Sequence, residues 1–114
     1  MVLASCGEPE TVGNGTPPRP VTLAAVDFAF EAEEAITISA GDTIDFTVVN
    51  EGNSDHQMEV LTDESRRLGM TERLSPGDSD TVRVTFEEPG VYVVICDIDD
   101  HRSLGQVARF TVEL

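Results

Sequence analysis

Cysteine and histidine are the residue types in this chain whose side chains bind soft metals, and they occur close together near its C-terminus. Four residues separate Cys96 from His101, and the one other histidine, His56, ends the polar turn Glu-Gly-Asn-Ser-Asp-His. Thiolate sulfur and imidazole nitrogen suit copper or zinc, and they suit calcium or magnesium poorly. Two histidines, one cysteine and a weak axial ligand form the trigonal blue-copper set, so these residue types predict a copper site.

The segment Gly-Val-Tyr-Val-Val-Ile-Cys (90–96) predicts a strand that ends at the cysteine. Side chains alternate between the two faces of a strand, so Tyr92, Val94 and Cys96 share one face. The other face is also apolar, which is typical of a strand inside a sandwich. A single cysteine on such a strand is more often inert than a ligand, and a single histidine in a turn is more often exposed. The copper interpretation therefore depends on the three residues meeting at one end of the fold.

Short alternating segments, separated by turn residues, make up most of the chain. The clearest pattern is Ile44, Phe46 and Val48, which alternate with polar residues. Strands are expected over residues 21–30 (with a bulge near Asp27), 35–39, 43–49, 57–61, 81–86, 90–96 and 107–114. Residues 63–74 are expected to form a loop with at most a short helix. Together these segments predict an all-β protein, a Greek-key β-sandwich of seven to eight strands.

Several motifs together resemble the cupredoxins, a family of small blue-copper electron carriers. The motifs are Ala-Gly-Asp-Thr-Ile-Asp-Phe-Thr-Val-Val-Asn (40–50), His56, Ser-Pro-Gly-Asp (75–78), Glu-Pro-Gly-Val-Tyr (88–92) and Cys-x4-His-x4-Gln (96–106). The resemblance covers residues 21–114. It implies a cupredoxin-like sandwich that holds one type 1 copper through His56, Cys96 and His101.

The resemblance also implies that Gln106 is the axial ligand, at a position where most of the family has methionine. The plant stellacyanins have glutamine at a similar spacing, but they carry a disulfide beside the site, and this chain has no cysteine left to form one. Met58 and Met70 are alternative axial candidates. The position of Met58 is more typical of a core residue, and Met70 lies in the segment 63–74 that crosses between strands, where a packed or exposed side chain is more typical than a ligand. Asp99 and Asp100 are either carboxylate ligands or members of a solvated acidic rim.

The charge of the chain limits its partners. Aspartate and glutamate number 22 against seven arginines and no lysine, which gives a formal charge of −15. Repulsion disfavours binding to nucleic acid and to anionic membrane surfaces. Attraction between opposite charges favours a redox partner with a basic face, such as a cytochrome. The family implies that electrons leave through His101. An acidic docking face is expected around it, formed by Asp97, Asp99, Asp100 and Arg102.

The function implied by the resemblance is that of a monomeric carrier that shuttles single electrons between redox proteins. The predicted ligands saturate the metal, and the chain lacks the further histidines that a multicopper oxidase needs, so catalysis is not expected. One alternative is a module that stores or delivers copper without transferring electrons. A metal-free domain for adhesion or assembly is a third reading, which the three intact ligands disfavour.

The N-terminal residues suggest an exported lipoprotein. Leu-Ala-Ser-Cys (3–6), followed by glycine, resembles a lipobox, with Cys6 as the lipid-bearing residue and 1–5 as the remnant of a signal peptide. Residues 6–20 would then be the lipid-anchor cysteine and a flexible linker, since they are rich in proline and glycine. Residues 21–114 are then expected to form one cupredoxin domain, because a chain of this length has room for a single domain. These features predict a periplasmic or cell-surface location.

Overall fold

The computed structural model describes residues 17–32 and 34–114, and these residues form a β-sandwich of nine strands. They contain no helix, and therefore none long and apolar enough to cross a membrane. The strands are β2 (Arg19–Val26), β3 (Ala29–Ala32), β4 (Ile38–Ser39), β5 (Asp42–Asn50), β6 (Glu59–Thr62), β7 (Arg67–Met70), β8 (Ser79–Phe86), β9 (Gly90–Ile95) and β10 (Val107–Glu113). The predicted all-β sandwich is confirmed, with nine strands where seven to eight were expected.

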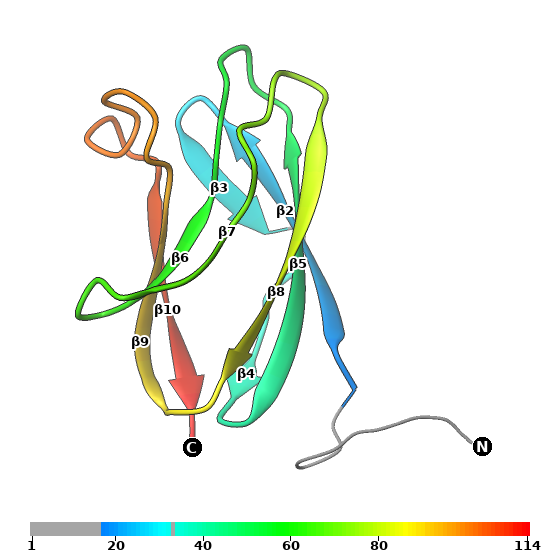
Figure 1. Cartoon of the computed structure of the whole chain (residues 1–114), viewed down its shortest axis with the longest axis vertical. Coiled ribbons are helices and arrows are strands. Elements are labelled where there is room, and N and C mark those ends of the chain that lie inside the picture. The colour runs from blue at the N-terminus through cyan, green and yellow to red at the C-terminus, as the bar shows by residue number, and fades with distance from the viewer. Residues whose placement is uncertain (1–16, 33) are drawn as a thin grey trace.

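Two mixed sheets make up the sandwich (Figure 1). The four-stranded sheet has the order β3-β2-β5-β8, and the five-stranded sheet has the order β4-β10-β9-β6-β7. Strand β2 runs parallel to β5, and β4 runs parallel to β10, while the other neighbours are antiparallel. The β2–β3 turn and the loop between β9 and β10 both lie at the end of the molecule opposite the C-terminus.

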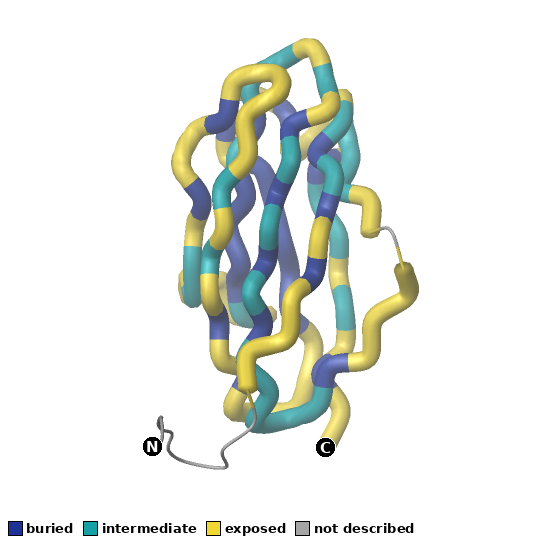
Figure 2. Tube along the Cα trace, turned by 90° about the vertical axis from the view of Figure 1, so that its right-hand side faces the viewer, coloured by how far each residue is buried: buried dark blue, intermediate teal, exposed yellow. Residues whose placement is uncertain are grey.

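Buried residues recur along the strands of both sheets, and they form the core between the sheets (Figure 2). On β5 the predicted residues Ile44, Phe46 and Val48 are all buried. Phe86 of β8 lies at the centre of an aromatic group, with its ring edge-on to Phe46 and to aromatic rings of the other sheet. Burial of each such side chain contributes roughly 1.5–3 kcal/mol. This core fixes the strand ends from which the site residues project.

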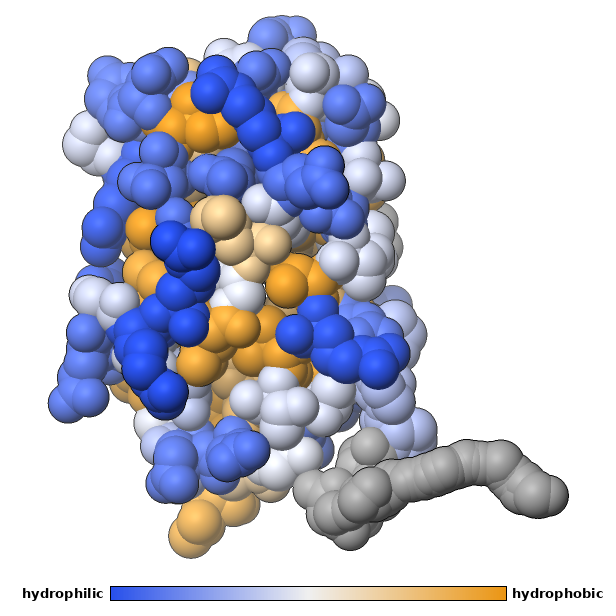
Figure 3. Space-filling model, in the orientation of Figure 1, coloured by the Kyte–Doolittle hydropathy of each residue, from blue (hydrophilic) through white to orange (hydrophobic). Residues whose placement is uncertain are grey.

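Strand β9 is apolar on both faces, but only one of them lies between the sheets. Tyr92 and Val94 belong to the core, whereas Val93 and Ile95 form a separate small cluster with Leu61. The chain continues from β9 directly into Cys96. On the face of the molecule drawn in Figure 3, hydrophilic side chains cover most of the surface and apolar side chains show between them.

The segment 21–30, expected to be one bulged strand, is instead two antiparallel strands. Strand β2 begins at Arg19 and ends at Val26, and β3 returns with Ala29 paired to Val26. The two residues between them form a tight turn in which the Asp27–Phe28 peptide bond is cis. The break in the alternating pattern therefore marks a reversal of the chain rather than a bulge.

Residues 63–74 were expected to form a loop, but strand β7 lies within them. It is an edge strand that pairs with β6 through Glu59 and Met70. Gly69 lies so close to β8 that a Cβ atom there would be 2.8 Å from a methyl of Val82. The close approach needs glycine, and glycine is the residue that weakens a strand pattern in the sequence.

Candidate metal centre

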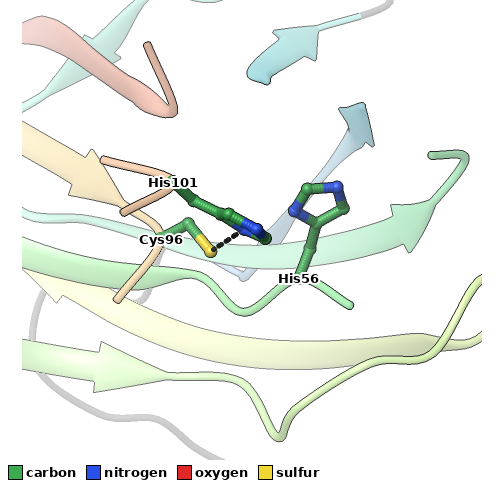
Figure 4. A group of neighbouring side chains, drawn as sticks. All are labelled: His56, Cys96 and His101. Carbon is green, nitrogen blue, oxygen red and sulfur yellow. Dashed lines mark hydrogen bonds between the residues drawn. The ribbon is translucent and has the colours of Figure 1, made fainter. Parts of the chain in front are cut away.

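Three predicted ligands, His56, Cys96 and His101, meet at one end of the sandwich. Their ligand atoms all lie within 4.8 Å of one another, and all three residues are buried. Figure 4 shows the side chains pointing toward one another from separate segments. His56 precedes β6, Cys96 follows β9, and His101 lies in the turns between β9 and β10.

Backbone hydrogen bonds hold the segment around His56 in place. The backbone N–H groups of His56 and Leu74 each donate to the carbonyl of the other residue, at 2.9 and 2.7 Å. The side chain of Asn50 donates to the carbonyls of Ser54 and Leu74, and it accepts from the N–H of Gly52. Because the amide is buried and uses both of its ends, the turn that carries His56 has a defined conformation.

The two ring nitrogens of His56 have different surroundings. Nε2 lies 2.6 Å from Oδ1 of Asp27, whereas the buried Nδ1 has no hydrogen-bond partner. A carboxylate can only accept, so the proton of the neutral ring lies on Nε2 and the lone pair on Nδ1. A lone pair with no partner inside a protein is available for a cation.

The loop from Cys96 to Gln106 folds back on itself through short-range hydrogen bonds. The N–H of Cys96 donates to the carbonyl of Gln106, and the N–H of Gln106 donates to the carbonyl of His101. The sulfur of Cys96 lies 3.5 Å from Nδ1 of His101. Gly105 has a φ of 119°, and a Cβ atom there would be 3.1 Å from the carbonyl oxygen of Phe28, so glycine is required at this position.

Gln106 is fully buried near the three ligands, and its amide has one orientation. The nitrogen Nε2 donates to two carbonyls, those of Val26 at 3.0 Å and Ala29 at 2.6 Å. Since a carbonyl oxygen can only accept and only the NH2 end of the glutamine amide can donate, the end that faces the two carbonyls is Nε2 and the other end is the oxygen Oε1. This oxygen is buried and has no hydrogen-bond partner.

Among the described residues, His56 Nδ1 and Gln106 Oε1 are the only buried side-chain polar atoms without a hydrogen-bond partner. An unsatisfied buried polar group typically costs about 1–3 kcal/mol. Both atoms are acceptors, so one bound cation would satisfy them together. A thiolate, two imidazoles and an amide oxygen are the donors that a trigonal copper site with a weak axial ligand uses. The residues present therefore fit copper.

The alternative candidates have different surroundings. Met58 is fully buried in the core between the sheets, and Met70 is an exposed residue of β7. Asp99 and Asp100 are exposed and do not belong to the group of ligand atoms.

The four predicted docking residues, Asp97, Asp99, Asp100 and Arg102, are all exposed. They line a shallow depression beside Cys96, together with Ser103, Val107 and Arg109. His101 itself is only 6% exposed, so little of this residue reaches the surface.

A buried carboxyl group lies next to this depression, on β6. Burial and the negative charge of Asp97 raise the pKa of Glu59, and the nearby guanidinium of Arg67 lowers it by less. The Arg67 Nε lies 3.5 Å from a carboxylate oxygen of Glu59. Asp97 therefore interacts with Glu59 as well as lining the surface.

Two residues of the β2–β3 turn, Asp27 and Phe28, belong to the site although they were not predicted to. Asp27 contacts His56, and the ring of Phe28 lies 4.7 Å from that of His101 and 6.1 Å from that of His56, measured between centroids. The one signal in the sequence is the interrupted alternation near Asp27, which predicted a bulge. Cys6, the predicted lipidation residue, lies outside the described residues.

Residues 3–108 match the model of the cupredoxin-like domain family. The chain belongs to the cupredoxin family. Its predicted copper cofactor agrees with that membership and with the cluster of His56, Cys96 and His101. No curated protein sequence matches this cupredoxin.

Solved structures of blue copper proteins share the fold of this cupredoxin. Auracyanin from the photosynthetic bacterium Roseiflexus castenholzii superposes with a TM-score of 0.70 at 20% identity, covering 87% of this chain and 98% of that one. Auracyanin A, a "blue" copper protein from Chloroflexus aurantiacus, has a TM-score of 0.70 at 16% identity, covering 85% and 100%. Rusticyanin has a TM-score of 0.68 at 20% identity, covering 84% and 79%.

Proposed function

We propose that this cupredoxin is a type 1 copper protein that carries single electrons between redox partners outside the cytoplasm. The observation that carries the proposal is the pair of unpartnered buried acceptors, His56 Nδ1 and Gln106 Oε1, beside a buried cysteine and a second histidine. These four donors suit both oxidation states of copper. The blue copper proteins of the same fold support the proposal.

Copper would supply a one-electron couple, and the protein would keep its ligands in place as the charge changes. Three sets of hydrogen bonds hold the ligand-bearing segments. They lie around Asn50, between Cys96 and Gln106, and between the Gln106 side chain and the carbonyls of Val26 and Ala29. Ligands fixed in this way move little between the two oxidation states. The amide oxygen of Gln106 is hard, so it would favour the copper(II) state more than a methionine sulfur does.

Burial of the ligands favours electron transfer over copper delivery. His56, Cys96 and Gln106 are each 0% exposed, and His101 is 6% exposed, so no ligand is presented to an incoming copper carrier. Voltammetry of the copper-loaded protein should show a reversible one-electron wave, and a copper(I) chelator should remove the metal slowly. Rapid transfer of copper to the chelator, with no reversible wave, would contradict the carrier function and support delivery.

We place the docking face at the exposed aspartates near His101. A surface of this charge should attract a basic cytochrome, and added salt should weaken the attraction as the Debye length falls to about 8 Å at physiological ionic strength. The rate of reduction by such a cytochrome should therefore fall as salt is added. A rate that stays flat across that range would contradict docking through this face.

We further propose that Cys6 carries a lipid that anchors the protein to a membrane. Leu-Ala-Ser-Cys supports this proposal as a lipobox-like sequence. The exported product should partition with membranes, and Cys6→Ser should release it or leave it unprocessed. Equal membrane attachment of Cys6→Ser and the unaltered protein would reject lipidation.

A further inference from the structure

The β2–β3 turn contacts three of the four predicted ligands, although it contributes no ligand itself. The carbonyls of Val26 and Ala29 accept hydrogen bonds from the amide of Gln106, and the ring of Phe28 packs against His101. Asp27, which follows Val26, contacts the ring of His56. This turn is therefore the part of the fold outside the ligand-bearing segments that most directly determines how the ligands lie.

We propose that Asp27 is a positioning residue for His56, which fixes its Nε2-protonated form and lowers the reduction potential of the bound copper. The inference rests on the proposed function and deepens it. It names a negative charge that acts on the metal through a ligand.

The contact between Asp27 and His56 is short, and both of its partners are held. Asp27 Oδ1 lies 2.6 Å from Nε2 of His56, and Asp27 Oδ2 accepts the backbone N–H of Asn53 at 2.9 Å. Both carboxylate oxygens are thus in use, which leaves the group little freedom to turn away. The side chain of His56 is fully buried, whereas that of Asp27 is 23% exposed.

Gly52 lies beside this contact, and its lack of a side chain leaves space for the carboxylate and the ring. A Cβ atom on Gly52 would lie 2.3 Å from Asp27 Oδ1 and 2.9 Å from His56 Nε2. A residue with a side chain would therefore displace the carboxylate or the ring. The backbone of the 50–56 turn thus passes directly beside the hydrogen bond.

The charge of Asp27 gives the contact its electronic effect. Both carboxylate oxygens of Asp27 accept hydrogen bonds from N–H groups, so neither oxygen needs a proton and the group carries its negative charge. A carboxylate that accepts from the far ring nitrogen makes the near nitrogen a stronger donor to a metal. Its negative charge also favours copper(II), which carries one more positive charge than copper(I).

Asp27→Asn tests the charge, because asparagine keeps the shape and an accepting oxygen. The copper-loaded variant should stay blue and have a higher reduction potential. A tenfold loss in the preference for copper(II) over copper(I) would raise the potential by about 59 mV for a one-electron couple. Asp55→Asn is the matched control, since it removes a partly exposed negative charge one residue before His56, where Asp55 is paired with Arg73. An unshifted potential in Asp27→Asn, or an equal shift in both variants, would overturn the proposal.

A second measurement tests the contact without copper and without any variant. Nitrogen-15 NMR of the copper-free protein should show that the neutral ring of His56 carries its proton on Nε2. A neutral ring with its proton on Nδ1 would overturn the positioning role. Failure of the proposed function would appear differently, as a protein that holds His56 in this form but binds no copper.

Discussion

Replacing Cys96 by serine is expected to abolish the visible absorption of the copper-loaded protein while the sandwich stays folded. The blue colour of such a site comes from charge transfer between thiolate and copper, and a hydroxyl cannot supply the soft anionic sulfur. Serine is nearly the same size as cysteine. The backbone N–H of Cys96, which donates to Gln106, is unaffected by the substitution.

Cys6→Ser is the matched control, because Cys6 is the other cysteine of the chain. It should leave the visible band at full intensity. Visible absorption measures the site in both variants, and far-ultraviolet circular dichroism measures the fold. Blue absorption that survives in Cys96→Ser would show that Cys96 is not the thiolate ligand.

Gln106→Met is expected to leave the site blue and to raise its reduction potential. Thioether sulfur is softer than an amide oxygen, so it favours copper(I) relative to the native residue. The substitution also removes the two hydrogen bonds from Nε2 to the carbonyls of Val26 and Ala29. Two acceptors then lose their partner, and the free energy of unfolding should fall by about 1–3 kcal/mol.

Met58→Leu and Met70→Leu are the controls for the axial assignment. Met58 packs in the core and Met70 is exposed on β7, so neither substitution should shift the potential. Voltammetry of the three variants separates the candidates. A potential that stays unshifted in Gln106→Met, with a shift in one of the methionine variants, would assign the axial position to that methionine.

Local spacing in the sequence predicted much of the site. Cys96, His101 and Gln106 lie on one loop, so a motif of 11 residues is sufficient to predict that they are close together. His56 is 40 residues before Cys96, so local spacing does not connect them; its residue type and, more strongly, the family resemblance did. The alternation on β5 and β9 predicted the buried faces correctly, because each of these strands has at least one face against the core.

The β2–β3 turn could not be predicted, because its partners are distant in the sequence. Asp27 is 29 residues from His56, and Val26 is 80 residues from Gln106. Nothing local requires a carboxylate or a free carbonyl at these positions. Strand β7 was missed for a related reason, since an edge strand buries little and its residues therefore show no clear alternation.

Titration of the copper-free protein with copper(II) is the most direct test of the site. An intense visible band should grow until one copper is bound per chain and stop there, and a mild reductant should bleach it reversibly. That result would establish a single thiolate-bound copper that changes oxidation state in place. Copper binding without such a band, or a band that keeps growing beyond one copper per chain, would contradict the type 1 site.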